Sequence, residues 1–238
     1  MEPLAIISDI HANYYALEAV LEDIDKNGIS EIICLGDLVG YGSMPNECVT
    51  EIRNRDIKCL MGNHDSYLIG DSNCERSQTV AEIISRHKQE VSKENKIWLS
   101  SLRSSTLRAD KLFVHGGPND TLDQYVYNFS NDLIEDLPLG VKFLICGHTH
   151  VQATFKHREF TFINPGSVGQ PRDGDSRAAY AVLIDGQVVL RRVAYNIRAA
   201  IDHAAANGYP LHCVSNLNKG TQIGGRIDTI RCGISLCE

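Results

Sequence analysis

Five short polar motifs of this chain carry side chains that could bind metal ions or move protons. They are Asp9-Ile10-His11, Gly36-Asp37, Gly62-Asn63-His64-Asp65, His115-Gly116-Gly117 and Gly147-His148-Thr149-His150, and each follows an apolar run. Five of the nine histidines fall within them. Imidazole nitrogens together with carboxylate and amide oxygens are ligands for divalent transition metals. The motifs therefore indicate a metal site built from nitrogen and oxygen donors.

Each motif also has a simpler interpretation when it is taken alone. Asp9 and Asp37 could cap helices, Asn63 could form a turn, and a lone loop histidine is more often structural than a ligand. Independent turns, however, give no reason for all five motifs to follow successive strands in this order. Ligand sites of open α/β sheets form where the carboxyl ends of strands meet. We therefore favour one joint site over five unrelated turns.

The apolar runs before the motifs predict buried strands, and helical periodicity lies between them. Strands that alternate with helices predict βαβ units, and closely spaced strands in the second half predict hairpins. We expect one domain over residues 1–215 and a polar, loosely packed tail over 216–238. Predicted strands cover 4–8, 31–35, 57–61, 106–109, 112–115, 143–146, 153–156, 160–164, 180–185 and 187–193, and predicted helices cover 14–26, 45–53, two segments of 79–102, and 197–207.

The composition is that of an ordinary globular protein. Of 238 residues, 43% are hydrophobic and 22% are charged. With 23 Lys and Arg against 30 Asp and Glu, the net charge of −7 offers no overall basic field for a nucleic-acid polymer. No apolar run reaches the ~20 residues that span a bilayer, and no signal peptide is recognisable, so we expect a cytoplasmic protein without a membrane partner. A homo-oligomer is left open.

The order of the five motifs resembles that of the calcineurin-like metallophosphoesterase family, D-x-H, G-D, G-N-H-D/E, H-x/G and G-H-x-H. The similarity runs from residue 4 to about residue 193, with every motif intact. The resemblance implies an α/β fold, a four-layer α/β/β/α sandwich of two mixed β-sheets flanked by helices. It also implies a hydrolase that acts on phosphoric ester bonds through a binuclear metal centre.

The resemblance further assigns roles to individual residues. Two divalent ions are expected, and manganese, iron, zinc, nickel or cobalt would suit ligands without a thiolate. Such a pair lowers the pKa of a bridging water, and the resulting hydroxide attacks the phosphoryl group. By this resemblance Asp9, His11 and His150 hold one metal, Asn63, His115 and His148 hold the other, Asp37 bridges them, and His64 is the catalytic histidine.

His64 follows a predicted ligand directly, so its ring could donate a proton to the leaving group or only orient the substrate. The family's Ser/Thr protein phosphatases have G-D-x-V-D-R-G where this chain has Gly36-Asp37-Leu38-Val39-Gly40-Tyr41-Gly42. Gly40 and Tyr41 thus replace the carboxylate that supports the histidine and the arginine that grips phosphate. This difference argues against a protein phosphatase and leaves open what orients His64, for which the adjacent Asp65 is one candidate.

The segments at 36–42, 45–48 and 164–172 resemble a narrower group of small bacterial phosphodiesterases. We therefore expect a small-molecule phosphodiester or phosphoanhydride substrate that is nucleotide-like, such as a dinucleoside polyphosphate. Arg172 and Tyr41 are the candidate substrate-binding residues, although Arg172 could equally be a solvated surface group. Tyr14 and Tyr15 could add to an aromatic wall. The alternatives are a phosphomonoesterase with the same binuclear site and a non-catalytic scaffold of this fold.

Overall fold

The computed structural model describes residues 2–70, 74–75 and 77–234. The helices are α1 (Tyr14–Lys26), α2 (Pro45–Asn54), α3 (Asn63–Ile69), α4 (Gln78–Glu90), α5 (Lys93–Ser100), α6 (Asn131–Glu135) and α7 (Ile197–Ala206), with short 3-10 turns η1 (Leu211–Cys213) and η2 (Leu217–Lys219). The strands are β1 (Leu4–Ile7), β2 (Glu31–Cys34), β3 (Lys58–Cys59), β4 (Ser105–Arg108), β5 (Lys111–Val114), β6 (Asn128–Phe129), β7 (Phe143–Ile145), β8 (Gln152–His157), β9 (Phe160–Pro165), β10 (Ala178–Ile184), β11 (Gln187–Val193) and β12 (Arg231–Cys232).

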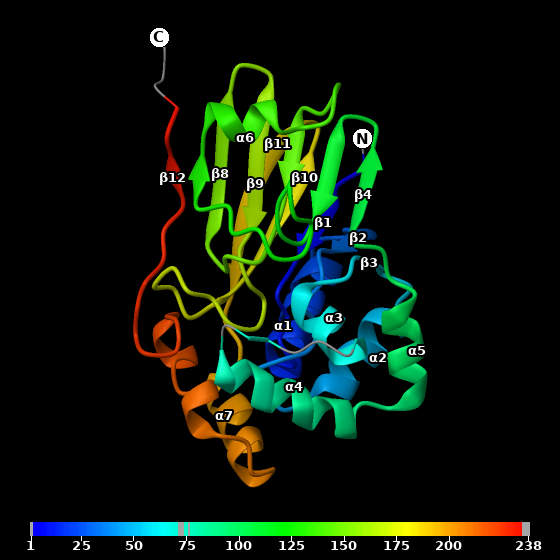
Figure 1. Cartoon of the computed structure of the whole chain (residues 1–238), viewed down its shortest axis with the longest axis vertical. Coiled ribbons are helices and arrows are strands. Elements are labelled where there is room, and N and C mark those ends of the chain that lie inside the picture. Colours follow the sequence, from blue (N-terminus) through cyan, green and yellow to red (C-terminus); the bar gives the residue numbers. More distant parts are fainter. Residues whose placement is uncertain (1, 71–73, 76, 235–238) are drawn as a thin grey trace.

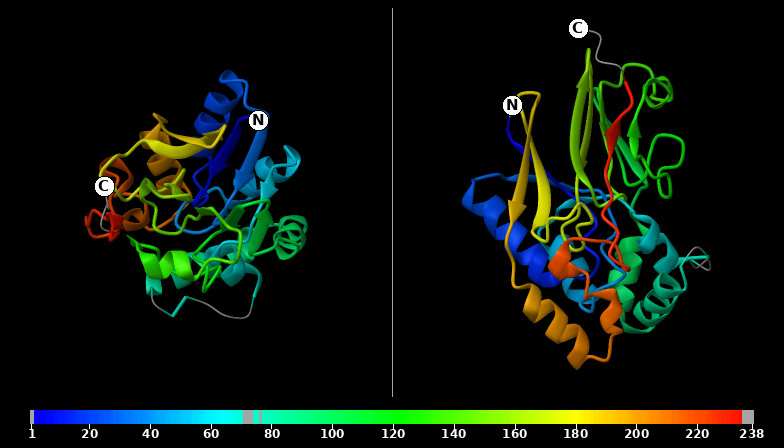
Figure 2. Two further views of the ribbon diagram at one scale, coloured as in Figure 1. Left: turned by 90° about the horizontal axis from the view of Figure 1, so that it is seen from above. Right: turned by 90° about the vertical axis from the view of Figure 1, so that its left-hand side faces the viewer.

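Two five-stranded sheets face each other, and both are mixed (Figure 1). The first has the order β11-β10-β1-β2-β3, in which β1 pairs parallel with β2 and antiparallel with β10. The second has the order β4-β5-β7-β9-β8, with β7 parallel to both of its neighbours. The side view in Figure 2 shows the sheets spread apart at one end and most of the helices gathered at the other.

Alternation along the strands divides the core into layers. In β1, Leu4 and Ile6 join the apolar cluster between the sheets, whereas Ala5 and Ile7 pack with helix α1. In β5, Phe113 lies between the sheets and Leu112 and Val114 face the outer cluster beside α6. Successive strand residues point to opposite faces, so one strand supplies two layers. The predicted four-layer α/β/β/α sandwich of two mixed sheets is confirmed.

Most of the regular elements lie where the sequence predicts them. The helix predicted over 14–26 has the same bounds as α1, and the pair predicted over 79–102 breaks at Val91, between α4 and α5. The sequence did not predict α3, because its first residues, Asn63 to Asp65, had been assigned to a loop motif. The short elements β6, α6 and β12 were also missed, since two to five residues carry too little periodicity.

The C-terminal segment contacts the rest of the chain at several points. Leu217 and Ile234 are buried, and β12 pairs with β6. The backbone N–H of Asp228 donates to the carbonyl oxygen of Arg172 at 2.8 Å. Residues 235–238 of the predicted tail lie outside the described residues. The division of the chain at residue 215 stays a prediction.

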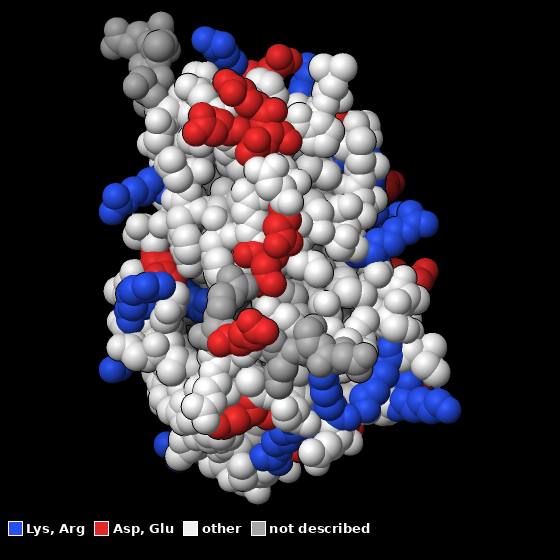
Figure 3. All heavy atoms as spheres, in the orientation of Figure 1, with Lys and Arg blue, Asp and Glu red and all other residues white. Residues whose placement is uncertain are grey.

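Charged side chains are unevenly spread over the face of the molecule that Figure 3 shows. Figure 3 shows acidic side chains along the middle of one face and Lys and Arg mostly toward its periphery, in keeping with the net charge of −7. In the part of the chain that the structure describes, no helix is both long and apolar enough to cross a bilayer.

The loops after β2 and β3 approach each other so closely that glycine is required between them. Gly36 has a φ of +104°, and a Cβ atom there would lie 2.3 Å from the backbone nitrogen of Gly62. A side chain at this position would therefore force the two loops apart. Both loops carry predicted metal ligands, Asp37 and Asn63.

We predict that Gly36→Ala lowers the free energy of unfolding by about 3 kcal/mol, because backbone overlap adds to the cost of a left-handed φ. The matched control is Gly28→Ala, whose φ is +68° but whose Cβ would meet nothing within 4 Å. It should cost only about 1 kcal/mol. Urea unfolding of both variants measures the difference. Equal losses would show that the loops do not press on each other at Gly36.

Candidate metal centre

The seven predicted metal ligands all lie just beyond strands, six of them on loops and Asn63 at the first position of α3. Asp9 and His11 follow β1, and Asp37 follows β2. The others follow β3, β5 and β7. All seven are buried: Asp9, His11, Asp37, Asn63, His115, His148 and His150. The structure therefore brings together residues that are up to 141 positions apart in the chain, as the joint-site hypothesis requires.

Five of these residues have a left-handed backbone, which L-amino acids other than glycine rarely adopt. They are Asp9, His11, Asp37, His148 and His150, with φ between 49° and 64°. Each turn bends the chain sharply just after a strand. Strained backbone of this kind persists only where the surrounding structure enforces it, and it concentrates at functional sites.

The first group of side chains consists of Asp9, His11 and His150. The Nε2 atoms of His11 and His150 are 3.0 Å apart, and Nε2 of His150 lies 3.3 Å from Oδ1 of Asp9. Each ring donates from Nδ1 to a carbonyl oxygen, that of Val39 for His11 and that of Gln170 for His150. These bonds fix both tautomers, so both Nε2 lone pairs point into the group.

The second group is built in the same way around His115. Its Nδ1 donates to the carbonyl oxygen of Leu35, and its Nε2 lies 3.0 Å from Oδ1 of Asn63 and 3.2 Å from Nδ1 of His148. The Oδ2 atom of Asp37 is 3.5 Å from this Nε2 and 3.6 Å from Nε2 of His11. Asp37 is therefore the side chain that the two groups share.

The donors in these groups fit divalent cations. Their ligand atoms lie within 4.8 Å of one another in each cluster. Two unprotonated imidazole nitrogens that face each other cannot satisfy one another, and among the described residues the buried Oδ1 of Asp9 has no hydrogen-bond partner. A cation between these atoms would satisfy all three. The potential ligand atoms of His64, His11 and Asp37 also lie within 4.8 Å of one another. Proximity alone therefore does not distinguish a metal ligand from a residue that only lies beside the metal.

Burial dominates the electrostatics of the centre. It lowers the pKa of all five histidines, which keeps them neutral and able to bind a cation. Burial and the charges of Asp65 and Asp9 raise the pKa of Asp37. Burial acts in the same direction on Asp9, but the nearby His150, His115 and His11 outweigh it and hold the pKa of Asp9 well below its usual value. Bound cations would favour the ionised form of both carboxylates.

Asp65 does not orient His64, so that expectation is wrong. Its carboxylate accepts hydrogen bonds from the backbone N–H groups of Asp37, Leu38, Val39 and Gly62, at 2.8 to 3.3 Å. Burial raises the pKa of Asp65 to about 6, against the effect of these four bonds. Asp65 therefore joins the loop after β2 to the start of α3, and the motif alone could not reveal this because the donors belong to the backbone.

His64 lies at the edge of the two groups. Its backbone N–H donates to Oδ1 of Asp37 at 2.8 Å, and its Nε2 is 4.0 Å from Oδ2 of the same residue. The rings of His11 and Tyr41 have centroids 4.8 Å and 5.0 Å away. Within the described residues its Nδ1 is buried without a hydrogen-bond partner. The ring thus lies close to the candidate ligands, and its Nδ1 atom is shielded from solvent.

Comparison with known proteins identifies this arrangement. The model of the calcineurin-like phosphoesterase superfamily domain matches residues 3–186. The chain belongs to this superfamily. Its members are metal-dependent, so the chain is a metallophosphoesterase, a hydrolase that acts on phosphoester bonds, as the resemblance implied. The number and identity of the metal ions, and the assignment of single ligands to each, stay predictions.

Three relatives place the chain within the superfamily. An uncharacterised protein of Methanocaldococcus jannaschii is 34% identical over 229 residues, which cover 87% of this chain and 93% of that protein. The phosphodiesterase YfcE of Escherichia coli K12 is 28% identical over 225 residues, covering 87% of this chain and 100% of YfcE. The crystal structure of a metallophosphoesterase from Sphaerobacter thermophilus has a TM-score of 0.82 at 32% identity and covers 92% of this chain and 98% of its own.

A pocket of about 480 Å³ opens beside the centre of this metallophosphoesterase. His64 and Asn63 line this pocket. The two candidate substrate-binding residues, Tyr41 and Arg172, also line it. Arg172 is buried, so the alternative that it is a solvated surface group is wrong. The remaining wall includes Tyr125, Tyr127 and Arg226, which no sequence motif marked.

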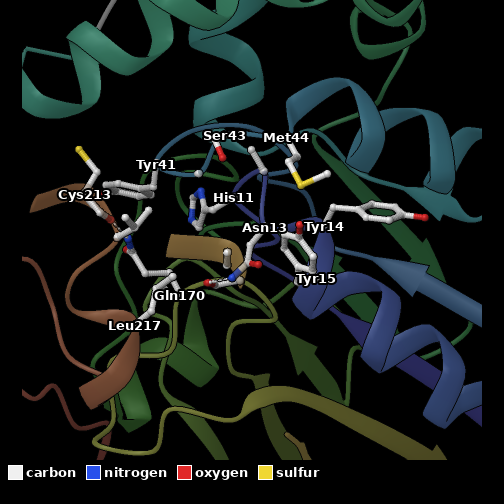
Figure 4. Close-up of a pocket in the computed structure, with 15 residues that line it drawn as sticks. His11, Asn13, Tyr14, Tyr15, Tyr41, Ser43, Met44, Gln170, Cys213 and Leu217 are labelled. Carbon is white, nitrogen blue, oxygen red and sulfur yellow. Dashed lines mark hydrogen bonds between the residues drawn. The ribbon is translucent and has the colours of Figure 1, made fainter. Parts of the chain in front are cut away.

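Tyr14 and Tyr15 do not line this pocket. They line a smaller hollow on the other side of His11, together with Tyr41 and Met44. Figure 4 shows Tyr41 on one side of His11 and both tyrosines on the other. Of the three tyrosines that the sequence suggested as an aromatic wall, only Tyr41 reaches the pocket that contains His64. Tyr125 and Tyr127 take their place, with stacked rings 5.6 Å apart.

We predict that Asp65→Asn lowers the free energy of unfolding by about 3 kcal/mol, because an amide cannot accept from four buried backbone donors. The control is Asp120→Asn, which changes an exposed carboxylate that accepts from the N–H groups of Leu122 and Asp123. It should cost less than about 1 kcal/mol. Denaturant unfolding of the metal-free proteins gives both values. A small loss for Asp65→Asn would remove this residue from the framework of the site.

Proposed function

We propose that this metallophosphoesterase hydrolyses a small-molecule phosphodiester or phosphoanhydride that carries a large, nucleotide-like substituent. In this proposal Asp9, His11 and His150 hold one divalent ion and Asn63, His115 and His148 the other, with Asp37 shared. His64 serves the reaction as the catalytic histidine, and Arg172 and Tyr41 bind the substrate. The observation that carries the choice of substrate is the buried guanidinium of Arg172 in the wall of a roomy pocket.

Arg172 is a fixed cation that lacks an anion. It is 7% exposed, and within the described residues it forms no ion pair with a carboxylate. Its Nη2 donates to the hydroxyl of Tyr41 at 3.2 Å and to Oε1 of Gln170 at 2.9 Å, whereas its buried Nε has no partner. Buried charges are normally paired. A phosphoryl oxygen is a suitable partner for such a guanidinium.

The backbone ties Arg172 to the candidate metal centre. Its N–H donates to the carbonyl oxygen of His150 at 3.1 Å. The guanidinium carbon of Arg172 lies 5.6 Å from the ring centroid of Tyr41, which is 5.0 Å from that of His64. Its positive charge lowers the pKa of His64 and of His150. An anion bound by Arg172 would therefore lie next to the cluster of histidines. This position suits a phosphoryl group held between the guanidinium and bound cations.

The size and lining of the pocket favour a substrate with a second substituent. A volume of about 480 Å³ falls within the range of small-molecule sites and exceeds what a phosphoryl group needs. Tyr41, Tyr125 and Tyr127 offer aromatic surface of the kind that stacks on a planar base. Where the protein phosphatases have the arginine that grips phosphate this chain has Tyr41, so that cation is missing for a dianionic monoester.

Each of the proposed site residues has a separate role in hydrolysis. When bound, the two metal ions would lower the pKa of a water molecule and neutralise charge on the phosphoryl group. Arg172 binds a non-bridging phosphoryl oxygen, and Tyr41 holds the guanidinium in place through its hydroxyl. A phosphoryl anion bound beside the ring would offset the effect of burial and let His64 hold a second ring proton, which it then donates to the leaving-group oxygen. The tyrosines bind the remote substituent and so help to position the reacting bond.

We predict that the metal-replete protein binds about two divalent ions per chain. Asp37→Asn should reduce binding at both sites, to below about one ion per chain, because Oδ2 of Asp37 faces an imidazole nitrogen of each group. The control His157→Ala alters a histidine on β8 outside the centre and should leave the metal content unchanged. Elemental analysis and titration calorimetry provide the readouts. A wild-type protein that is saturated with metal at a single ion per chain would exclude the binuclear assignment. The identity of the metal and the cytoplasmic location stay predictions.

We predict that aryl phosphodiesters are hydrolysed at least about tenfold faster in kcat/KM than matched monoesters, a difference of ~1.4 kcal/mol in transition-state binding. Arg172→Gln should lower kcat/KM for diesters by about 10²-fold. Arg177→Gln is the control, since Arg177 is exposed and pairs with Asp175 at 2.6 Å. It should change the rate less than about twofold. A tenfold preference for monoesters would favour the phosphomonoesterase, and no metal-dependent hydrolysis at all would favour the scaffold.

A further inference from the structure

The loop formed by Gly40, Tyr41 and Gly42 lies directly against the ring of His64. Gly40 has a φ of +93°, and a Cβ atom on it would lie only 2.1 Å from Nδ1 of His64. The ring centroid of Tyr41 is 5.0 Å from that of His64. Nδ1 of His64 has no hydrogen-bond partner among the described residues. The ring is therefore held by packing against this loop, and the loop must itself be held in place.

His87 holds this loop through hydrogen bonds at both of its ends. It lies on α4, is fully buried, and has no recognisable motif around it. Its Nδ1 accepts a hydrogen bond from the backbone N–H of Gly40 at 3.2 Å, and its Nε2 donates to the carbonyl oxygen of Gly42 at 3.1 Å. One neutral tautomer satisfies both bonds at once. His87 thereby fixes both ends of the three-residue loop.

The other contacts of the loop fix its position relative to the candidate ligands. The backbone N–H of Gly42 donates to the carbonyl oxygen of His11 at 3.1 Å. A Cβ atom on Gly42 would lie 2.5 Å from the same oxygen, so this side of the loop has no spare room. The loop is thus clamped between the His11 turn and His87. If His87 were removed, Gly40 and Gly42 would each lose a backbone hydrogen bond, and the loop would be less firmly held against His64.

We propose that His87 is a positioning residue for His64 and acts through the Gly40–Gly42 loop. In the family's protein phosphatases a carboxylate at the position of Gly40 supports the catalytic histidine. Here glycine lets the backbone touch the ring, and a histidine from another helix supports that backbone. The inference rests on the proposed role of His64 in hydrolysis. A misplacement of about 1 Å in a reacting group can lower a rate by ~10²-fold, so the support has a measurable effect.

The test compares His87→Leu, which removes both hydrogen bonds, with His87→Gln, whose amide can accept from Gly40 and donate to Gly42. The substrates are matched aryl phosphodiesters with phenolate or 4-nitrophenolate as the leaving group. His87→Leu should lower kcat about tenfold for phenolate but less than about threefold for 4-nitrophenolate, which needs less protonation. KM and metal content should not change, and His87→Gln should recover most of the loss.

A double-mutant cycle with His64→Ala separates positioning from a general loss of stability. In the His64→Ala background, His87→Leu should lower kcat less than about twofold further, because the residue that it positions is absent. The matched control is Ile84→Ala, a buried residue of the same helix. It should lower the stability without any dependence on the leaving group. A loss that is equal for both leaving groups, or equal in both backgrounds, would overturn the proposal.

Two further measurements keep the proposal testable if one variant or assay fails. If His87→Leu does not fold, Gly40→Ala displaces the His64 ring directly and should reproduce the leaving-group pattern; its absence would contradict the inference. If the wild type hydrolyses no phosphodiester, the proposed function fails, but the ring contact can still be measured. NMR signals of His64 should then shift in His87→Leu and remain in place in Ile84→Ala, and an unchanged His64 signal would overturn the role of His87.

Discussion

Two carboxylates and five imidazoles, all buried, meet at the ends of the two sheets. Removing ionised groups from water costs several kcal/mol each unless opposite charge or hydrogen bonds replace the water. The chain meets this constraint in two ways. Backbone carbonyl oxygens accept a hydrogen bond from Nδ1 of His11, His115 and His150. The Nε2 lone pairs of these rings face a common space, where cations would balance the charges of Asp9 and Asp37. The loops around this space are arranged to satisfy these requirements.

The loops also have to carry unfavourable backbone conformations. Left-handed turns at five candidate ligands cost of order 1 kcal/mol or more each. Two buried side chains offset part of this cost by bonding to the backbone of the loops: Asp65 gathers four N–H groups, and His87 joins Gly40 to Gly42. The rigid part of the centre therefore includes residues that never face the reacting atoms. The positions of the candidate ligands therefore depend on hydrogen bonds to the loop backbone as much as on which residues the ligands are.

The sequence predicted those parts of the structure that depend on short segments. Each motif follows an apolar strand, so the position of Asp9, Asp37 and His115 at strand ends could be read locally. Tyr125 and Tyr127 could not be found in this way, because they reach the pocket only through the packing of a loop between β5 and β6. Asp65 was noticed but given the wrong partner, since backbone donors leave no trace in residue types.

The roles of His87 and Arg172 could not be predicted from the sequence either, because their partners lie far away in the chain. His87 bonds to residues 45 and 47 positions away, and its neighbours on α4 form an ordinary amphipathic helix. Arg172 sits in a loop whose composition is typical of a surface, yet Gln170, Tyr41 and the segment up to Asp228 enclose it. Periodicity and motif spacing describe what one element does, whereas these roles arise where elements from different parts of the chain meet.

The central place of β1 has a consequence for how the protein is made. This strand is synthesised well before β10, which pairs with one of its edges and ends at Ile184. Contacts between such distant segments form slowly, because a long loop must close first. Until then β1 presents an unpaired edge of the kind that promotes aggregation. The first sheet therefore reaches its mature form only after β10 has been made, and until that pairing forms, the loop after β1 that carries Asp9 and His11 rests on an incomplete sheet.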